Sequence, residues 1–133
     1  MKCGTDICNV ERMKCAIDEL GDKFLKRIFT QSEINYCEKY NVTKYEKYAA
    51  RFAGKEAVYK AISPSNNQYG SFTEVEILNT ETGKPVVVLH GKLKEIANGM
   101  KLEISLSHEK EYAIAFCVIE EEKLWKLLIH MHI

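Results

Sequence analysis

"RFAGKEAVYKAI", residues 51–62, decides how the helical half of this 133-residue chain can be assembled. At about 100° per residue, this stretch and the residues just before it place two neighbouring strips on one predicted helix. One strip is aromatic, and the other is so small that another backbone or a ligand can come close. The aromatic strip is Tyr45, Tyr48, Phe52 and Tyr59; the small strip is Ala50, Ala53, Gly54, Ala57 and Ala61.

Glu56 and Lys60 fall between the two strips, and we expect Arg51 and Lys55 on the far side, facing solvent or a long anion. The i,i+4 spacing of Glu56 and Lys60 is typical of an exposed ion pair that contributes roughly 0.3–0.5 kcal/mol. A carboxylate withdrawn from water costs several kcal/mol without a strong partner, and such a pair is too weak to offset that. A divalent cation is therefore the alternative partner for Glu56.

The first half of the chain predicts one strand followed by helices. Residues 1–10 favour a strand, and residues 11–29 carry apolar side chains at helical spacing, with a break near Gly21. The sequence "TQSE" at 30–33 has the capping-box pattern that begins a second helix. The helix of residues 51–62 should start near Thr43 and end before Pro64.

The second half predicts strands. Residues 74–78 and 85–91 flank a hairpin in which Gly83 is available for a positive φ, and a short helix should end at Gly99. A further pair of strands is expected at 101–107 and 112–120, with Leu102, Ile104 and Leu106 on one face. This order indicates an α+β fold, in which helices cover an antiparallel sheet. We expect residues 1–120 to form one domain and 121–133 to be an apolar C-terminal extension of it.

Composition narrows the classes of function. Lys plus Arg and Asp plus Glu both number 19, so no overall charge favours nucleic acid or a membrane surface. The five cysteines are odd in number and contain no C-x-x-C, which fits neither a disulfide framework nor a zinc cluster and favours a reducing cytoplasm. The chain shows neither an apolar run long enough to cross a bilayer nor the apolar stretch of a signal peptide.

Two further residues are candidates for chemistry. Asp6, in "GTDI" at 4–7, lies near Gly4, which lets other backbone approach; alone, an Asp here is more often a turn or helix-start residue. Beside Glu56, however, it would supply the second hard oxygen ligand of a Mg²⁺ that also binds water and substrate phosphates. His108 is expected in a turn between two strands, either in water or as a hydrogen-bond donor to phosphate. Arg51, Lys55 and Lys60 would add the positive charge that phosphoryl transfer needs.

These residues together resemble a known family. "GTDICNVER" fits G-x-D-I-x-x-x-x-R, and "FAGKEAVYKA" fits [WF]-x-x-K-E-A-x-x-K-A. With "SLSHEKEYAIA" at 105–115, the set resembles the phosphopantetheinyl transferases, and its length and motif order resemble their small holo-(acyl-carrier-protein) synthase type. The resemblance covers residues 1 to about 120.

The resemblance implies a Mg²⁺-dependent enzyme that moves the 4′-phosphopantetheine arm of coenzyme A to a serine of apo acyl carrier protein and releases adenosine 3′,5′-bisphosphate. Asp6 and Glu56 then resemble the metal ligands, and Lys60 the group that neutralises or protonates the leaving phosphate. The serine proton would go to Asp6 or to a metal-bound water. His108, Arg51, Lys55 and the hairpin tip at Gly83, Lys84 and Pro85 resemble coenzyme-binding positions, and Arg12 a contact to the acidic carrier protein.

The resemblance also implies a homotrimer with active sites between subunits. Such an assembly would give the alanine-glycine strip and the exposed sheet surface something to pack against. Two features depart from the family pattern. Phe52 stands where some relatives have tryptophan, and the tail from residue 121 extends past the usual end. We expect the tail's apolar residues Trp125, Leu127, Leu128 and Ile129 to pack on the body or at a subunit contact, while His130 and His132 alone make a poor metal site.

Two other classes of function remain open on the residues alone. Asp6, Glu56 and Lys60 could serve a Mg²⁺-dependent phosphodiesterase acting on nucleic acid, although zero net charge and the lack of an aromatic-basic strip argue against it. The chain could also be a non-catalytic binding domain that uses its sheet and its small-residue strip as an interface.

Overall fold

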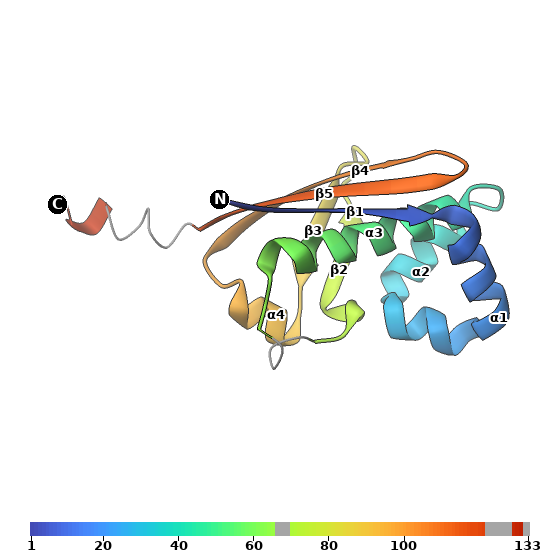
Figure 1. Cartoon of the computed structure of the whole chain (residues 1–133), viewed down its shortest axis with the longest axis horizontal. Coiled ribbons are helices and arrows are strands. Elements are labelled where there is room, and N and C mark those ends of the chain that lie inside the picture. The colour runs from blue at the N-terminus through green and yellow to red at the C-terminus, as the bar shows by residue number, and fades with distance from the viewer. Residues whose placement is uncertain (66–69, 122–128, 132–133) are drawn as a thin grey trace.

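The computed structural model describes residues 1–65, 70–121 and 129–131 of the chain and confirms the expected α+β fold (Figure 1). Its elements follow one another in the predicted order. They are β1 (Lys2–Asn9), α1 (Val10–Ile28), α2 (Gln31–Glu38), α3 (Lys44–Ile62), the 3-10 helix η2 (Phe72–Glu74), β2 (Val75–Asn79), β3 (Pro85–Leu89), α4 (Gly91–Ile96), β4 (Met100–His108) and β5 (Tyr112–Glu121).

The strands form two antiparallel sheets. A three-stranded sheet has the order β1-β5-β4, and β2 pairs with β3 in a separate hairpin. Helix α3 runs along one face of the three-stranded sheet, while α1 and α2 lie together beyond one end of it and α4 lies toward the other (Figure 1). The central helix therefore contacts both halves of the chain, and the hydrophobic core lies between α3 and the strands.

The small strip of α3 is what lets this packing form. Ala53, Ala57 and Ala61 are at most 1% exposed, because β1 and β5 lie directly on them. Gly4 makes the closest approach: a Cβ atom at this position would lie 2.2 Å from the carbonyl oxygen of Ala57. The backbone that approaches the strip thus belongs to the same chain. The expectation that a ligand or a second subunit fills the strip is wrong.

Local signals set most of the element ends. Thr30 caps α2 with both hydrogen bonds of a capping box, and α1 is kinked at Gly21, where φ is 70°. Gly83 in the β2–β3 turn has φ 87°, and Gly99 has φ 83°, although α4 itself ends at Ile96. One expectation is corrected: His108 is the last residue of β4, where it pairs with Ala113, and not part of the following turn.

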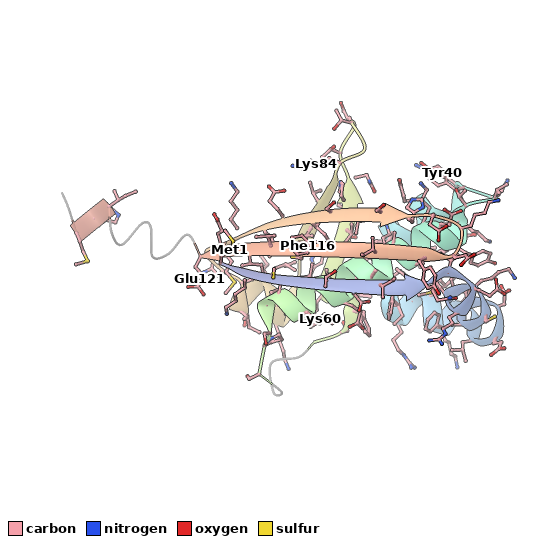
Figure 2. The ribbon with its side chains drawn as sticks, turned by 45° about the horizontal axis from the view of Figure 1, so that its top comes forward. Met1, Tyr40, Lys60, Lys84, Phe116 and Glu121 are labelled. Carbon is pink, nitrogen blue, oxygen red and sulfur yellow. The ribbon has the colours of Figure 1, made fainter. Side chains whose placement is uncertain are left out.

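The outer face of the three-stranded sheet is not covered by another element of the described chain. On β4 the predicted alternation is confirmed, with Leu102, Ile104 and Leu106 facing the core and the polar residues outward. The outer face of β1 and β5, by contrast, is apolar. Ile7 is 61% exposed, and Tyr112, Ile114 and Phe116 are 45–48% exposed; Figure 2 shows Phe116 on this face. An apolar patch of this kind is typical of an interaction surface.

Three remaining expectations concern the cysteines, membrane spans and the tail. All five cysteines are free, which agrees with the expectation that their number and spacing do not fit a disulfide framework. Within the described ranges, no helix is long and apolar enough to cross a membrane. Of the tail residues, Trp125, Leu127, Leu128 and His132 lie outside the described residues, whereas Ile129 is 45% exposed and His130 is exposed.

Candidate active site

The end of α3 and the middle of β1 bring the predicted catalytic residues together. Lys60 Nζ donates hydrogen bonds to Asp6 Oδ1 and to the Thr5 carbonyl oxygen, both at 3.0 Å. The close approach at Gly4 makes this contact possible, because it lays β1 against the turn of α3 that carries Lys60. Asp6 and Lys60 therefore meet although 54 residues separate them in the sequence.

Glu56 lies near the same pair and is partly withdrawn from water, as predicted. Burial raises the pKa of the Glu56 carboxyl group, the negative charge of Asp6 raises it further, and Lys60 opposes the shift. Burial together with Asp6 and Glu56 also raises the pKa of the Cys8 thiol to about 11. The two carboxylates therefore lie within electrostatic reach of each other. Since the ion-pair partner of Lys60 is Asp6, the interpretation of Glu56 and Lys60 as a simple exposed pair is wrong.

The carboxylate pair fits a divalent cation. Repulsion between Asp6 and Glu56 disfavours the ionised form of Glu56, and a cation between hard oxygen ligands would relieve it. Across the described residues, no group of three or more His, Cys, Asp or Glu side chains could hold a metal ion. A cation here would therefore take its other ligands from water and substrate, as Mg²⁺ usually does at phosphate-binding sites.

A hollow of about 400 Å³ opens beside these residues, lined by Glu56, Tyr59, Lys60, Gly70 and Phe72. Tyr59 donates a hydrogen bond from its hydroxyl to the Ser71 carbonyl oxygen at 2.8 Å. The ring of Phe72 lies 5.4 Å from that of Phe52 and 6.2 Å from that of Tyr59. The lining of this first hollow thus combines a carboxylate, an ammonium and aromatic side chains.

A second hollow, of about 170 Å³, collects most of the predicted coenzyme-binding residues. Its lining includes Arg51, Gly83, Pro85 and His108, with Tyr36, Lys47, Ala50, Asn79 and Leu106. Arg51 precedes Glu56 by five positions, which turns it about 140° around the helix. The two hollows consequently share no lining residue. Within one chain, the predicted metal ligands and the predicted phosphate contacts are therefore separate.

Arg51 is buried at 3% exposure, so the expectation that it faces solvent is wrong. Its guanidinium lies 4.0 Å from the centre of the Tyr36 ring and donates a hydrogen bond from Nη2 to Asn79 Oδ1. Its Nε atom is buried without a hydrogen-bond partner among the described residues. The guanidinium is thus held between Tyr36 and Asn79 at the edge of the second hollow.

His108 also lines this hollow, and its Nδ1 atom lies 2.9 Å from Glu46 Oε1 on α3. The contact fixes the imidazole ring on the sheet, so His108 is not a freely solvated turn residue. Lys84, at the tip of the hairpin that projects from the body in Figure 2, reaches instead to Glu103 Oε2 at 3.5 Å. Gly83 and Pro85 are therefore the hairpin residues that line the hollow.

Lys55 requires the largest correction. The side chain is fully buried, and its Nζ atom lies 2.7 Å from Glu33 Oε1. It also donates hydrogen bonds to the carbonyl oxygens of Phe72 and Val75. An ammonium has three N–H donors, and all of them are used here. Lys55 therefore cannot meet a coenzyme phosphate from this position, and the prediction that it faces an anion is wrong.

Arg12 lies exposed in the first turn of α1, just after the strand that carries Asp6. Its position leaves the guanidinium accessible to a partner. Sequence reasoning missed the residues that complete both hollows: Phe72 in the first, and Tyr36, Lys47 and Asn79 in the second. It also missed Glu33 and Glu46, the partners of Lys55 and His108. Only Glu33 carried a signal, as the third helical residue of the capping box.

Comparison with known proteins gives a consistent result. The family model described as "4'-phosphopantetheinyl transferase superfamily" matches residues 2–117. A holo-(acyl-carrier-protein) synthase of Ruminiclostridium cellulolyticum is 47% identical over 122 residues, which cover 90% of this chain and 91% of that protein. One of Dehalococcoides mccartyi is 46% identical over 121 residues, covering 89% of this chain and 97% of that protein.

Solved structures agree with the sequence matches. The Bacillus anthracis holo-(acyl-carrier-protein) synthase in complex with CoA (3',5'-ADP) has a TM-score of 0.75 at 31% identity, covering 90% of this chain and 96% of that one. The Helicobacter pylori holo-(acyl-carrier-protein) synthase in complex with coenzyme A has a TM-score of 0.77 at 29% identity, covering 89% and 99%. The fold is thus that of these synthases.

Proposed function

The chain belongs to the 4′-phosphopantetheinyl transferase superfamily, and from this premise we propose that it transfers the 4′-phosphopantetheine group of coenzyme A to a serine of apo acyl carrier protein. The by-product would be adenosine 3′,5′-bisphosphate. Relatives that are 46–47% identical are holo-(acyl-carrier-protein) synthases, and two structural neighbours are in complex with the coenzyme or its fragment. The observation that carries the proposal is the convergence of Asp6, Glu56 and Lys60 beside one hollow.

Asp6 and Glu56 would hold the Mg²⁺ ion. When bound there, the ion supplies positive charge that polarises the diphosphate of the coenzyme. The two carboxylates would fix the position of the ion, since their places on β1 and α3 are set by the packing at Gly4. Asp6 is also a candidate acceptor for the proton of the attacking serine, with water as the alternative.

Lys60 would act on the leaving group. Its side chain is 54% exposed, so its ammonium can move from Asp6 toward a phosphate at the mouth of the first hollow. Positive charge at that point stabilises the negative charge that develops during phosphoryl transfer, and a proton from Nζ could neutralise the departing phosphate. The partly exposed position suits a group that must exchange its proton between turnovers.

The second hollow would bind the one phosphate of the coenzyme that lies outside the reacting diphosphate. Arg51 supplies the positive charge there, and His108, Gly83 and Pro85 line the same space. Lys84 at the exposed hairpin tip remains a predicted contact. Since the two hollows share no residue within one chain, a coenzyme that contacts both sets fits best across a subunit boundary.

We therefore propose a homotrimer in which neighbouring copies pack on the exposed apolar face of β1 and β5. This face carries Ile7, Tyr112, Ile114 and Phe116, and burying such side chains is the usual driving force for association. Each active site would then combine Asp6, Glu56 and Lys60 of one copy with Arg51 and His108 of another. Arg12, exposed next to the Asp6 strand, would contact the acidic carrier protein, and the free cysteines suit a cytoplasmic enzyme.

The test is incubation with coenzyme A, Mg²⁺ and apo acyl carrier protein, followed by mass spectrometry of the carrier. We expect the carrier to gain one phosphopantetheine group at a serine and adenosine 3′,5′-bisphosphate to appear in equal amount. A phosphodiesterase would cleave the coenzyme or a nucleic acid and leave the carrier unmodified. A non-catalytic binding domain would leave both substrates unchanged, and either result would reject the proposal.

A further inference from the structure

We propose that Lys55 is a positioning residue for the first hollow: together with Glu33 it ties the segment Ser71–Val75 to α3 and so sets where Phe72 stands in the lining that it shares with Glu56. The functional part of this inference rests on the proposed transfer reaction. Its geometric part rests only on the contacts of the described residues. Lys55 thus serves the coenzyme site through another residue and does not touch the coenzyme.

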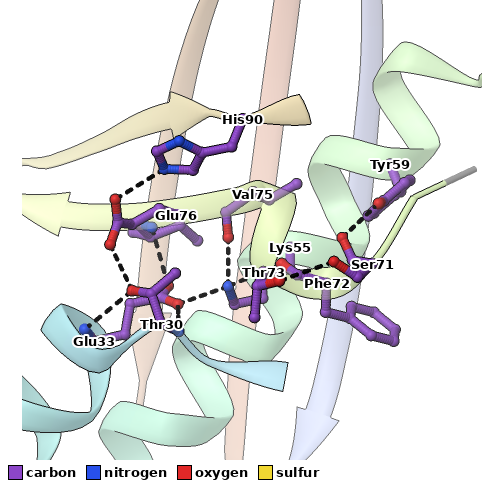
Figure 3. A network of polar contacts seen from close by, with 11 residues as sticks. Thr30, Glu33, Lys55, Tyr59, Ser71, Phe72, Thr73, Val75, Glu76 and His90 are labelled. Atoms are coloured by element: carbon purple, nitrogen blue, oxygen red, sulfur yellow. Dashed lines mark hydrogen bonds and ion pairs between the residues drawn. The ribbon is translucent and has the colours of Figure 1, made fainter. Parts of the chain in front are cut away.

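Two of the three contacts of Lys55 lead to one segment, Ser71–Val75 (Figure 3). From α3 its buried ammonium reaches across to the carbonyl oxygens of Phe72, at 3.1 Å, and Val75. These two carbonyl groups bracket the 3-10 helix η2, so one side chain holds both of its ends. The third donor goes to Glu33 Oε1 at 2.7 Å, which keeps the ammonium from turning away.

Glu33 extends the tie to α2 and β2. Its Oε1 atom also accepts a hydrogen bond from the Thr30 backbone N–H at 2.9 Å, and its Oε2 atom accepts one from the Ile77 N–H at 3.0 Å. Like Lys55, the side chain is fully buried. Among the described residues, Lys55 and Glu33 thus bind only backbone groups and each other. Lys55 holds the segment before β2 from α3, and Glu33 holds β2 itself at Ile77.

The segment that Lys55 holds lines the first hollow through Phe72. Lys55 directly precedes Glu56 in the sequence. The predicted metal ligand is therefore the neighbour of the side chain that holds Phe72 in place. Tyr59, one turn later on α3, makes a second tie to the same segment through the Ser71 carbonyl oxygen. Phe72 itself packs between the rings of Phe52 and Tyr59. Residues of helix α3 therefore line the first hollow and also hold the segment that contains Phe72.

Stability alone does not explain a charged pair at this place. Burial lowers the pKa of Lys55 and Glu33 opposes this, so removing the ammonium from water carries a cost that the ion pair does not fully offset. Buried ion pairs are often replaceable by apolar side chains without loss of stability. An apolar pair would, however, leave the Phe72 and Val75 carbonyl groups without the donor that fixes their direction.

The test compares Lys55→Met with the double variant Glu33→Gln and Lys55→Met. The single variant leaves the Glu33 carboxylate buried without its partner, and the double variant removes that charge while the glutamine oxygen can still accept a backbone hydrogen bond. We expect the single variant to melt at a lower temperature and the double variant to regain most of the loss. In both, the KM for coenzyme A should rise about tenfold, the low end of the effect of losing one apolar contact in a pocket.

A purely structural role gives a different pattern, in which KM returns to the wild-type value whenever the melting temperature does. That result, or an unchanged KM in the folded single variant, would overturn the proposal. Lys44→Met is the matched control, since Lys44 is a lysine of the same helix whose ion pair with Glu38 lies on the surface. It should change neither quantity.

Hydrogen–deuterium exchange of residues 71–77 tests the tie independently of activity. Exchange at the Glu74 and Ile77 amides should become faster in both Lys55 variants and stay unchanged in Lys44→Met. If wild-type protein fails to modify the carrier, the proposed reaction is rejected, whereas the tie is still decided by this exchange. Unchanged exchange in the variants would reject the tie even in an active enzyme.

Discussion

Lys60 Nζ donates a hydrogen bond to Asp6 Oδ1 at 3.0 Å, and this contact joins the last turn of α3 to the middle of β1. An i,i+4 partner, Glu56, is available on the same helix, yet the ion pair forms across two elements. The consequence is a compact group of two carboxylates and one ammonium beside a hollow. This group, and not the helix alone, provides the chemistry proposed here.

Removing either predicted metal ligand should stop transfer and leave the fold intact. We expect Asp6→Asn and Glu56→Gln to lower kcat/KM by at least about 100-fold, the scale of losing one electrostatic group that stabilises the transition state. Neither side chain belongs to the hydrophobic core, so thermal unfolding should change little. Asp18→Asn, on the surface of α1, is the control. Near wild-type turnover at limiting Mg²⁺ in either variant would remove that residue from the site.

Lys60→Met should separate catalysis from binding. Since Lys60 is assigned to the leaving phosphate, its loss should lower kcat by about 10²- to 10³-fold, as for other groups that stabilise developing charge. The dissociation constant of coenzyme A, measured by calorimetry, should change far less. If only that constant moves and kcat does not, Lys60 is a binding residue and its catalytic role is wrong.

The ionisation of Glu56 should depend on Asp6. Burial and the Asp6 charge raise the pKa of Glu56, so Asp6→Asn should lower it, which a carboxyl NMR titration of the metal-free protein can measure. Because the pKa is higher in the folded than in the unfolded state, the folded state holds this proton more tightly. The contribution of Glu56 to the free energy of unfolding therefore decreases as pH rises from the unfolded to the folded pKa. An unshifted titration in Asp6→Asn would show that the carboxylates are not coupled.

Gly4→Ala should destabilise the protein more than Gly54→Ala. At Gly4 the new methyl group would meet the Ala57 carbonyl oxygen at 2.2 Å, and backbone cannot move aside easily. At Gly54 it would meet Ile77 Cδ1 at 2.4 Å, where a side chain can rotate, and alanine is the better helix former. We expect a loss of about 1–3 kcal/mol for Gly4→Ala in urea unfolding, the usual cost of overpacking. Equal losses in the two variants would contradict the close packing of β1 on α3.

The proposed division of the site between subunits predicts complementation. Glu56→Gln and His108→Ala should each be poorly active, but mixing them by joint refolding should restore intact sites at boundaries where each copy supplies the residue the other lacks. In a trimer assembled at random from equal amounts, about a quarter of the sites would be intact. Activity that stays at the level of the separate variants would place both residues in the site of one chain, or show that no shared site forms.

More of the fold than of the candidate site could be predicted from the sequence. The sequence determined the elements, because their signals are local: the capping box at Thr30 and the positive φ at Gly83 act within a few residues. The same holds for the alternation of β4 and the two strips of α3. The candidate catalytic residues Asp6, Glu56 and Lys60 come from the resemblance of their motifs to a known family, and their catalytic roles stay a prediction.

Only the tertiary structure decided which charged side chains are buried and which partners they contact. By its position on the helix Lys55 should face solvent, yet Glu33 and the carbonyl groups of Phe72 and Val75 enclose its ammonium. Arg51 is likewise buried by Tyr36 and Asn79. These partners come from α2 and from the segments around β2, and no local pattern specifies how such distant elements meet. Helical periodicity gives the direction of a side chain, but its environment depends on what the rest of the chain places there.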